Sequence, residues 1–507
     1  MTSFLAPILF IGVCLWVISF KYKEIVHDFV SYKNEVLGWP FSRKIFVASC
    51  FFLVLIILGI AFYASLFPPH LMQEFDALNY HLTLPRQHLI LNSFEHISWS
   101  TADLYLMPLD FALAPYWLAT QLPNKFPQFL FFMGLVMISV NLVRYFSKNN
   151  LTSILLMIFA VFGFHIIGIQ AGTAMLDIVM AYLLLAALDS FIRGSWAMCA
   201  VEFAFYFWAK SFTPIQMTLI LVGVTTAFFV LRWLGAKGVK WSLNCDIDQR
   251  LLKEKGSLFK KVTILFLILS IVIGGPFIAK TIAYVGTPLF PFGVGMMNDN
   301  TKIDRNSQAW ESLVAKSQLC LATRNQYGSG RSIKEFIRHL WLIAVPEKGV
   351  NNRYDYPVGL MYLLFSGPFF VITIQALWKR QFPLLSVFVI VFWLVWWTGT
   401  HQTRFLFVPL LLMLIVGVIE TKIHTRMLMV AMFIALALVS LSVFRAHKND
   451  FGKSRYEVLR QKDKELLELS RSIRPKEKAQ INFYDAAFAQ FPINVIHNSS
   501  VFVLEYE

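Results

Sequence analysis

The chain has 507 residues, of which 57% are hydrophobic and 15% are charged, and its formal net charge is +15. Soluble proteins carry about 25% charged residues, so this composition excludes an ordinary soluble domain. Apolar runs close to the length that crosses a bilayer recur along most of the chain, and they indicate an all-α polytopic membrane protein. A membrane β-barrel would show short segments of alternating polarity instead.

About twelve apolar stretches are predicted to span the membrane as helices. They cover residues 3–20, 45–67, 127–143, 151–170, 173–192, 195–209, 214–231, 262–282, 357–377, 383–398, 404–421 and 427–444. No Lys or Arg precedes the first stretch, and it lacks a small-residue cleavage site. We therefore interpret it as a retained span rather than a signal peptide.

Basic residues gather in the short connections on one side of the predicted membrane. They include Lys21, Arg43, Arg144, Arg193, Lys379, Lys422 and a cluster between Arg232 and Lys261. The positive-inside rule assigns that side to the cytoplasm. Topology thus explains most of the net charge. Because no nucleic-acid-binding motif is present, the expected partner is the lipid bilayer and not nucleic acid.

The same rule places two long loops, 68–126 and 283–356, on the outer side, together with the tail. We divide the chain into a membrane domain, 1–444, and a small extracytoplasmic tail, 445–507. In the first loop, the stretches His88–Leu91 and Leu104–Ala119 are predicted to form amphipathic helices on the membrane surface. The tail is predicted to begin with a charged helix at about 451–472, followed by a stretch of alternating apolar residues.

An acidic cluster follows the second span directly. Glu74, Asp76, Tyr80 and His81 come soon after the apolar run ends at Pro68-Pro69. Ionisable groups are costly at the edge of a membrane unless they bind a polar group or perform chemistry. A carboxylate here could accept a proton from a hydroxyl or bind a cation. The alternative is a solvated acidic turn that caps the next helix.

Asp177 is a second acidic candidate, a few residues into a predicted span and level with Asp76 on the outer side. A carboxylate in the first turn of a helix complements the helix dipole, which is the structural interpretation. A charge within apolar sequence also commonly faces a polar cavity, which is the functional one.

Two cations lie at the outer ends of predicted spans, against the positive-inside bias. Lys210 ends one span, and Arg404 begins another, where the helix dipole disfavours a cation. Both placements are explained if an anion binds outside, since Arg and Lys suit phosphate. The alternative is that both side chains reach lipid headgroups. Candidate neighbours of the anion are His81, Arg86, His401 and Gln402, whereas Asp103 and Asp110 are interpreted as structural.

The acidic cluster also resembles a known family. Asp76-Ala77-Leu78-Asn79-Tyr80-His81-Leu82, followed by Pro85, is similar to the first outer loop of membrane glycosyltransferases of the GT-C class. This class includes protein O-mannosyltransferases and the aminoarabinose transferase that modifies lipid A. Glu74-Phe75-Asp76 resembles its acidic ExD or DxD signature.

Four further segments follow in the order and on the side that the class would have. Asp177–Ala181 looks like its second acidic position, and Ala209-Lys210 like the small-residue–Lys step that ends a later span. Gly286–Pro291 resembles its Gly-Asn-Pro-x-x-Pro loop, with Thr287 in place of Asn. Gln402–Pro409 is similar to its Arg-Tyr-Leu-Leu-Pro helix start.

The resemblance implies an inverting glycosyltransferase that uses a polyprenyl-phosphate-linked sugar and an acceptor of unknown identity. Asp76, Glu74 and Asp177 would form the catalytic set, with Asp76 as general base. Lys210 and Arg404 would hold the phosphate, and the substrate-binding set would also include Tyr80, His81, Arg86, His401 and Gln402. We expect a multi-pass protein of the bacterial cell envelope, in the inner (plasma) membrane, with its site on the outer side.

Two matters stay open at this point. The class has metal-dependent and metal-independent members, so the cofactor is unknown: a divalent cation or none. The chain could instead be a transporter or flippase of a lipid-linked sugar, although no inverted repeat is visible. It could also be a polymerase or ligase of surface polysaccharide, which would favour an outer loop rich in Arg and His.

The charge pattern makes a direct prediction about topology. In a background whose five native cysteines are replaced by serine, single cysteines introduced as Glu95→Cys and Asn300→Cys should react with a membrane-impermeant maleimide in intact cells, because both loops are assigned to the outer side. Lys379→Cys, in a predicted cytoplasmic connection, is the control and should react only after lysis. Labelling of the two loop positions only from the cytoplasmic side would contradict the assignment.

Overall fold

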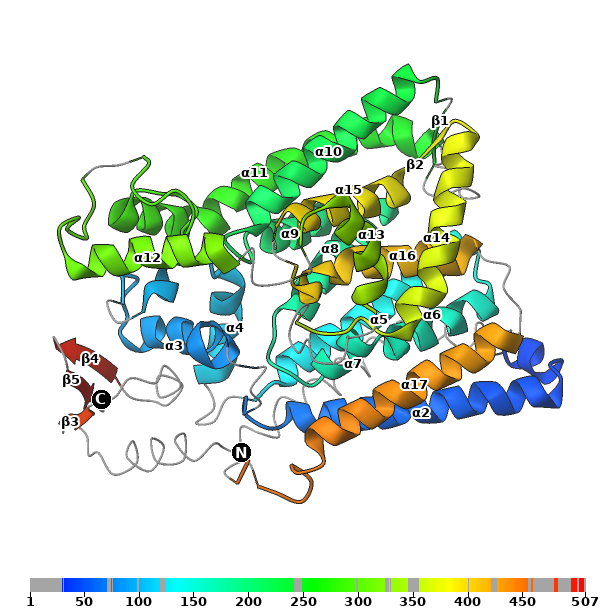
Figure 1. The fold of residues 1–507 in the computed structure, drawn as a ribbon, viewed down its shortest axis with the longest axis horizontal. Coiled ribbons are helices and arrows are strands. Elements are labelled where there is room, and N and C mark those ends of the chain that lie inside the picture. The colour runs from blue at the N-terminus through cyan, green and yellow to red at the C-terminus, as the bar shows by residue number, and fades with distance from the viewer. Residues whose placement is uncertain are drawn as a thin grey trace.

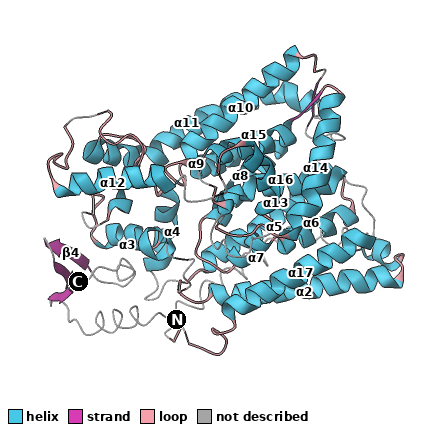
Figure 2. Cartoon of the chain, in the orientation of Figure 1, coloured by secondary structure: helices cyan, strands magenta, loops and turns pink. Residues whose placement is uncertain are grey.

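The computed structural model is almost entirely helical (Figures 1 and 2). The residues that it describes are 30, 32–70, 74, 76–97, 100–118, 124–236, 238–240, 249–297, 300–323, 328, 330–344, 355–399, 401–420, 426–454, 457–458, 478–481, 494–498 and 501–505. The predicted span 3–20 lies outside this part of the chain, and so does most of the charged helix predicted at 451–472.

Each of the other predicted spans coincides with a helix or a broken pair of helices. These helices are α2 (Phe41–Ser65), α5 (Phe126–Phe146), α6 (Leu151–Gly163), α7 (His165–Gln170), α8 (Asp177–Arg193), α9 (Trp196–Phe207), α10 (Thr213–Trp233), α11 (Gln249–Val285), α14 (Leu360–Trp378), α15 (Leu384–Thr398), α16 (Phe407–Glu420) and α17 (Arg426–His447). Within the described residues, seven helices are long and apolar enough to cross a membrane. The protein is therefore an all-α membrane protein.

The remaining elements are short and belong mostly to the loops. They are the π-helical turn η2 (Ala77–His81), α3 (Thr83–Ile90), the 3-10 turn η3 (Thr101–Leu104), α4 (Pro108–Leu118), α12 (Gln308–Thr323), α13 (Ile333–Leu342) and the 3-10 turn η4 (Thr403–Leu406). Strands β1 (Gly238–Lys240) and β2 (Gln381–Pro383) pair in parallel. In the tail, β3 (Lys478–Ile481), β4 (Asn494–Asn498) and β5 (Val501–Glu505) form an antiparallel sheet in the order β3-β5-β4.

Helix α16 lies at the centre of the helical core. Every residue from Phe407 to Val418 is buried, and the helix packs against α5, α6, α8, α14 and α15. A helix that is apolar on all sides must be enclosed by others. By contrast, α10 and α11 expose large apolar side chains such as Val222 and Val272. In a membrane protein such faces are suited to contact with lipid.

Helices α2 and α17 lie side by side along their length (Figure 1). Near their shared end, the hydroxyl of Tyr63 donates a hydrogen bond to the carbonyl of Asp450 (3.1 Å), and the backbone N–H of Gly452 donates to Tyr63 (3.2 Å). The start of the loop after α2 and the start of the tail therefore meet at one place.

Several predicted boundaries differ from those of the structure. The predicted span 151–170 is broken at Phe164, where the backbone is extended and the N–H of His165 donates to the carbonyl of Val358 (3.2 Å). The span predicted from residue 173 becomes helical only at Asp177, after a loop. The two helices predicted for the first long loop begin elsewhere than predicted, α3 at Thr83 and α4 at Pro108. Helix α4 begins late because Tyr105 is extended and separates it from η3.

The approach of the 171–176 loop to α2 depends on Gly172. A Cβ atom there would lie 2.9 Å from the Cβ of Ala64 and 3.1 Å from the carbonyl oxygen of Ala61. Gly172→Ala should therefore lower stability by about 1–3 kcal/mol, the usual cost of overpacking. Thermal unfolding in detergent, followed by intrinsic fluorescence, measures this change. Gly367→Ala, where a Cβ meets nothing within 4 Å, is the matched control; equal melting temperatures for the two variants would contradict the packing argument.

Candidate active site

A cavity of about 490 Å³ lies among η2, the segment after η3, the start of α10, the end of α15 and η4. Its polar lining includes Asp76, Tyr80, His81, Lys210, Gln402 and Arg404. Its walls are otherwise largely apolar and include Leu106, Met107, Phe212 and Trp396. A concave site with mostly apolar walls and a few convergent charged groups is the usual form of a small-molecule site.

Ion pairs join the charged residues of this region. Arg404 Nη1 lies 3.0 Å from Asp76 Oδ2, and Arg404 Nε lies 3.1 Å from Asp355 Oδ2. Lys210 Nζ lies 2.8 Å from Asp177 Oδ1. Asp177 and Arg404 also line a small adjoining pocket. Two cations and three carboxylates thus come together from five different segments of the chain.

Each of these side chains is positioned by the end of a helical element. Asp76 immediately precedes η2, Asp177 is the first residue of α8, and Arg404 lies in η4, before α16. Lys210 lies in the short turn between α9 and α10. The centroid of the Phe405 ring lies 5.2 Å from Lys210 Nζ and 5.3 Å from Arg404 Cζ, so one aromatic ring lies within cation–π range of both cations.

The two carboxyl groups paired with Arg404 differ in their protonation. Burial raises the pKa of Asp76, but the positive charges of Arg404, His81 and Lys210 outweigh it, and the net pKa is lowered. Burial also raises the pKa of Asp355, and there the charge of Arg404 does not outweigh it, so this pKa reaches about 6. Asp76 is therefore firmly ionised at neutral pH, whereas Asp355 takes up a proton in mildly acidic solution.

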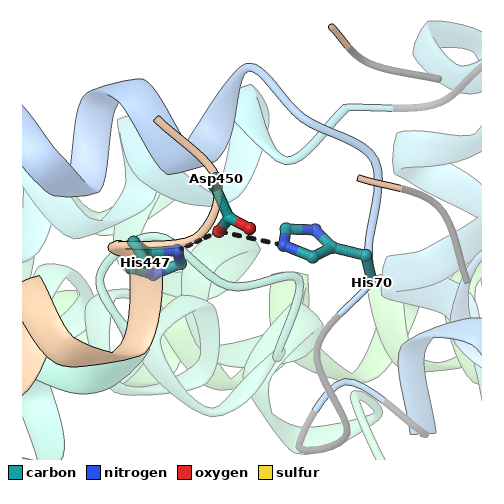
Figure 3. A group of neighbouring side chains, drawn as sticks. All are labelled: His70, His447 and Asp450. Atoms are coloured by element: carbon teal, nitrogen blue, oxygen red, sulfur yellow. Dashed lines mark hydrogen bonds and ion pairs between the residues drawn. The ribbon is translucent and has the colours of Figure 1, made fainter. Parts of the chain in front are cut away.

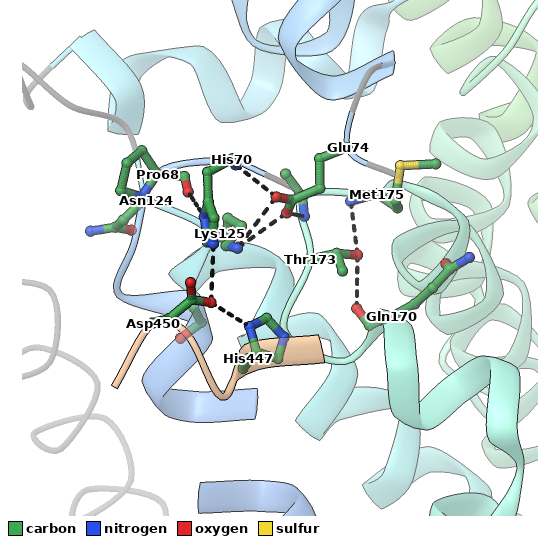
Figure 4. Close-up of polar contacts among 12 residues, drawn as sticks. Pro68, His70, Glu74, Asn124, Lys125, Gln170, Thr173, Met175, His447 and Asp450 are labelled. Carbon is green, nitrogen blue, oxygen red and sulfur yellow. Dashed lines mark hydrogen bonds and ion pairs between the residues drawn. The ribbon is translucent and has the colours of Figure 1, made fainter. Parts of the chain in front are cut away.

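Glu74 does not line the cavity but holds three segments together (Figure 4). Its carboxylate lies 3.2 Å from Lys125 Nζ, and both side chains are fully buried. It accepts hydrogen bonds from the backbone N–H groups of His70 and Ala174, each at 2.9 Å. This arrangement ties the end of α2 to the start of α5 and to the loop before α8. Glu74 is thus placed to position Asp76, two residues later.

His81 reaches the cavity while it is held from behind by Asp110. The two side chains are buried, and His81 Nδ1 lies 2.9 Å from Asp110 Oδ2. Burial raises the pKa of Asp110, and the charge of His81 opposes that rise. The ring of Tyr80 packs against His81 and, edge-on, against Tyr105. Asp110 therefore acts as a support for a cavity residue, in line with its interpretation as structural.

Asp103 forms a separate network that anchors the loop after α2 to α11. Its carboxylate contacts His88 (2.5 Å), His96 (3.0 Å), Lys280 Nζ (2.8 Å) and the backbone N–H of Ile97 (2.7 Å). Burial raises the pKa of Asp103, but these partners outweigh it and hold the pKa well below its usual range. Every member is satisfied within the protein, so this network is structural.

Two of the predicted substrate-binding residues do not line the cavity. Arg86 is buried within α3. His401 is buried and stacks on Trp397, with ring centroids 4.3 Å apart, and its Nε2 lies 3.1 Å from the Trp397 carbonyl oxygen. Asp355 was not among the site residues predicted from the sequence. A signal was available in the sequence: Asp355 lies just before the predicted span 357–377, and Arg404 likewise lies at the start of a predicted span.

No protein-family model matches the sequence, and no curated protein matches it. Among solved structures, the crystal structure of ArnT from Cupriavidus metallidurans bound to undecaprenyl phosphate matches with a TM-score of 0.45 and 12% sequence identity. The match covers 83% of this chain and 69% of that chain. A likeness at this level assigns neither a family nor an activity, so the function of the cavity rests on its own residues.

The raised pKa of Asp355 predicts pH-dependent anion binding. As the pH falls through about 6, Asp355 becomes neutral and stops competing for Arg404. Sulfate, whose charge is constant in this range, should then bind about tenfold more tightly at pH 5.5 than at pH 8, a change of about 1.4 kcal/mol. Calorimetric titration measures this affinity.

Asp355→Asn should bind sulfate tightly and nearly independently of pH. Asp304→Asn, which alters an exposed carboxylate, is the control and should keep the wild-type dependence. The same pH profile in wild type and Asp355→Asn would contradict the assignment of the titration to Asp355.

Proposed function

We propose that the chain is an integral membrane glycosyltransferase that moves a sugar from a polyprenyl-phosphate donor to an acceptor hydroxyl on the extracytoplasmic face. The observation that carries this proposal is that Lys210, Arg404 and Asp76 line one cavity. Two cations suited to phosphate thus lie beside an ionised carboxylate suited to accept a proton. The motifs that resemble the GT-C class contribute all three of these residues.

The walls of the cavity also suit a lipid-linked substrate. Ile215 and Leu219 line the cavity and are at the same time among the exposed apolar residues of α10. Because α10 is long and apolar enough to cross a membrane, an orientation with this side of the cavity toward the acyl region of the bilayer suits its exposed apolar residues. A prenyl chain could lie along this apolar wall while its phosphate reaches Lys210 and Arg404.

In the proposed reaction the acceptor oxygen attacks the anomeric carbon of the donor sugar. Asp76 takes the proton of that hydroxyl as the new carbon–oxygen bond forms. The bond between the anomeric carbon and the phosphate oxygen breaks, and the polyprenyl phosphate leaves with the bonding electrons. Attack from the side opposite the leaving group inverts the anomeric centre. Lys210 and Arg404 stabilise the negative charge that develops on the phosphate.

The ion pairs of the structure give this site a resting state. Arg404 is engaged by Asp76 and Asp355, and Lys210 by Asp177. An arriving phosphate competes with these carboxylates for the two cations. When it takes Arg404, it frees Asp76 to act as a base beside the bound donor. Asp177 and Asp355 remain as counter-charges that hold the cations in place after the product leaves.

Asp76→Asn separates the roles of binding and proton transfer. The amide keeps the shape of the carboxylate but accepts no proton, so kcat for sugar transfer should fall by about 10²–10⁴-fold. The apparent affinity for the donor should rise or stay the same, because the Asn variant no longer holds Arg404 by charge. Transfer of radiolabelled sugar in proteoliposomes measures both quantities. Near-normal turnover would rule out Asp76 as the base, and label that crosses the bilayer without changing carrier would favour a flippase.

Arg404→Lys tests the geometry of the phosphate contact. A lysine keeps the charge but cannot form the two-pronged contact of a guanidinium, so transfer should be impaired at least about tenfold. Arg338→Lys, in an exposed ion pair with Glu335, is the matched control and should behave as wild type. Full activity of Arg404→Lys would leave Arg404 with only a general electrostatic role.

A further inference from the structure

A second cluster of ionisable groups lies outside the cavity, at the shared end of α2 and α17 (Figure 3). It consists of His70, just after α2, His447, the last residue of α17, and Asp450. Asp450 Oδ2 lies 3.1 Å from His70 Nε2 and 3.0 Å from His447 Nδ1. One ligand atom from each residue lies within 4.8 Å of the other two.

The cluster is enclosed and rigidly supported. The exposed fraction of each of the three side chains is below 10%. Asp450 is fixed through its backbone, since its N–H donates to the His447 carbonyl (2.9 Å) and its own carbonyl accepts from Tyr63. The three side chains are therefore held toward one point by the packing of α2 against α17.

The hydrogen bonds of His70 require a positive charge between its Nε2 atom and the Asp450 carboxylate. His70 Nδ1 lies 2.9 Å from the carbonyl oxygen of Pro68, which can only accept, so Nδ1 carries a proton. In the neutral ring, Nε2 then presents a lone pair to the carboxylate oxygen of Asp450. Two lone pairs at 3.1 Å repel each other unless a positive charge lies between them. That charge is either a second proton on His70 or a metal ion.

The network around Asp103 is a similar cluster in which protein groups alone balance the charge of the carboxylate. There, too, two histidines contact one buried aspartate, but Lys280 supplies the cation, 2.8 Å from Asp103 and 3.1 Å from His88 Nε2. Among the described residues, no ammonium or guanidinium group takes this position beside Asp450. The otherwise similar cluster thus has no described ammonium or guanidinium group to balance its carboxylate.

We propose that His70 Nε2, His447 Nδ1 and the Asp450 carboxylate bind one divalent transition-metal ion, and that Zn²⁺ fits this donor set best. Tetrahedral Zn²⁺ with nitrogen and oxygen ligands at about 2.0–2.1 Å separates its ligand atoms by about 3.3 Å. The two contacts of 3.0 and 3.1 Å are close to such edges, and the two imidazole nitrogens lie within 4.8 Å of each other, so side-chain rotations can bring all three atoms to one ion. Imidazole ligands disfavour Mg²⁺ and Ca²⁺, which prefer oxygen. Water completes the coordination.

The Pro68 carbonyl would act as the outer partner that orients a metal-bound imidazole, because it fixes which nitrogen of His70 is free to bind. From His70 the connection continues to the first outer loop, since its backbone N–H donates to Glu74, which pairs with Lys125 (Figure 4). A metal ion here therefore clamps the loop that carries Asp76 to the end of α17. The ion is a positioning element and does not touch the substrate.

The test uses the full-length protein purified in detergent without a polyhistidine tag. After treatment with a chelator, Zn²⁺ is titrated in competition with a chromophoric chelator, and Co²⁺ is added separately as a spectroscopic probe. We expect about one tight site per chain and visible Co²⁺ bands of a nitrogen- and oxygen-ligated, four- or five-coordinate ion. Asp450→Asn and His447→Gln should weaken Zn²⁺ binding by at least about 100-fold.

His96→Gln is the matched control, because it removes a histidine from the Asp103 network; its Zn²⁺ affinity should equal that of wild type. The wild-type chain also gives an answer that does not depend on a variant folding: its melting temperature should rise with Zn²⁺ concentration. Wild-type protein that shows neither a Co²⁺ spectrum nor a Zn²⁺-dependent melting temperature would overturn the proposal. So would Zn²⁺ binding that Asp450→Asn and His447→Gln leave unchanged, or that His96→Gln abolishes.

Discussion

The ion pair between Arg404 and Asp76 is the interaction on which the rest of the site depends. It joins residues 328 positions apart, one before η2 and one in η4, where both side chains are largely buried. Charges held there lose hydration, and their mutual attraction rarely returns more than that loss. Such a pair adds little stability, so its presence is best explained by a role in binding or catalysis. A phosphate that displaces Asp76 from Arg404 exchanges one anion for another, and the local charge balance is kept.

The residues around this pair hold Asp76 in position. Glu74, two residues before Asp76, forms an ion pair with Lys125 and accepts hydrogen bonds from two backbone N–H groups. These contacts define the path of the chain into η2. Breaking a buried pair of this kind leaves an uncompensated charge, which costs several kcal/mol, about 3–5. The loop after α2 is therefore anchored by Glu74 near its start and by the Asp103 network further along. The proposed metal site would extend the first anchor to α17.

Much of the helical architecture could be predicted from the sequence, because the length and hydrophobicity of an apolar run are enough to predict a membrane helix. The break at Phe164 could not, since it depends on a backbone contact with Val358, about 190 residues away. In the site, Lys210 and Arg404 stood out because they oppose the expected charge bias. Glu74 and Asp76 looked alike in sequence, and only their partners distinguish them. Asp355 and the pairing of His70 with Asp450 depend on tertiary contacts that no local pattern reports.

Recognition of a lipid through its phosphate is the property of this cavity on which the proposed function depends. The most direct measurement compares the binding of a polyprenyl phosphate with that of the uncharged polyprenol of the same length, in wild type and in Arg404→Gln. Wild type should bind the phosphate at least about tenfold more tightly than the alcohol, a difference of about 1.4 kcal/mol, and Arg404→Gln should lose most of this preference. Equal affinity of wild type for the phosphate and the alcohol would contradict it.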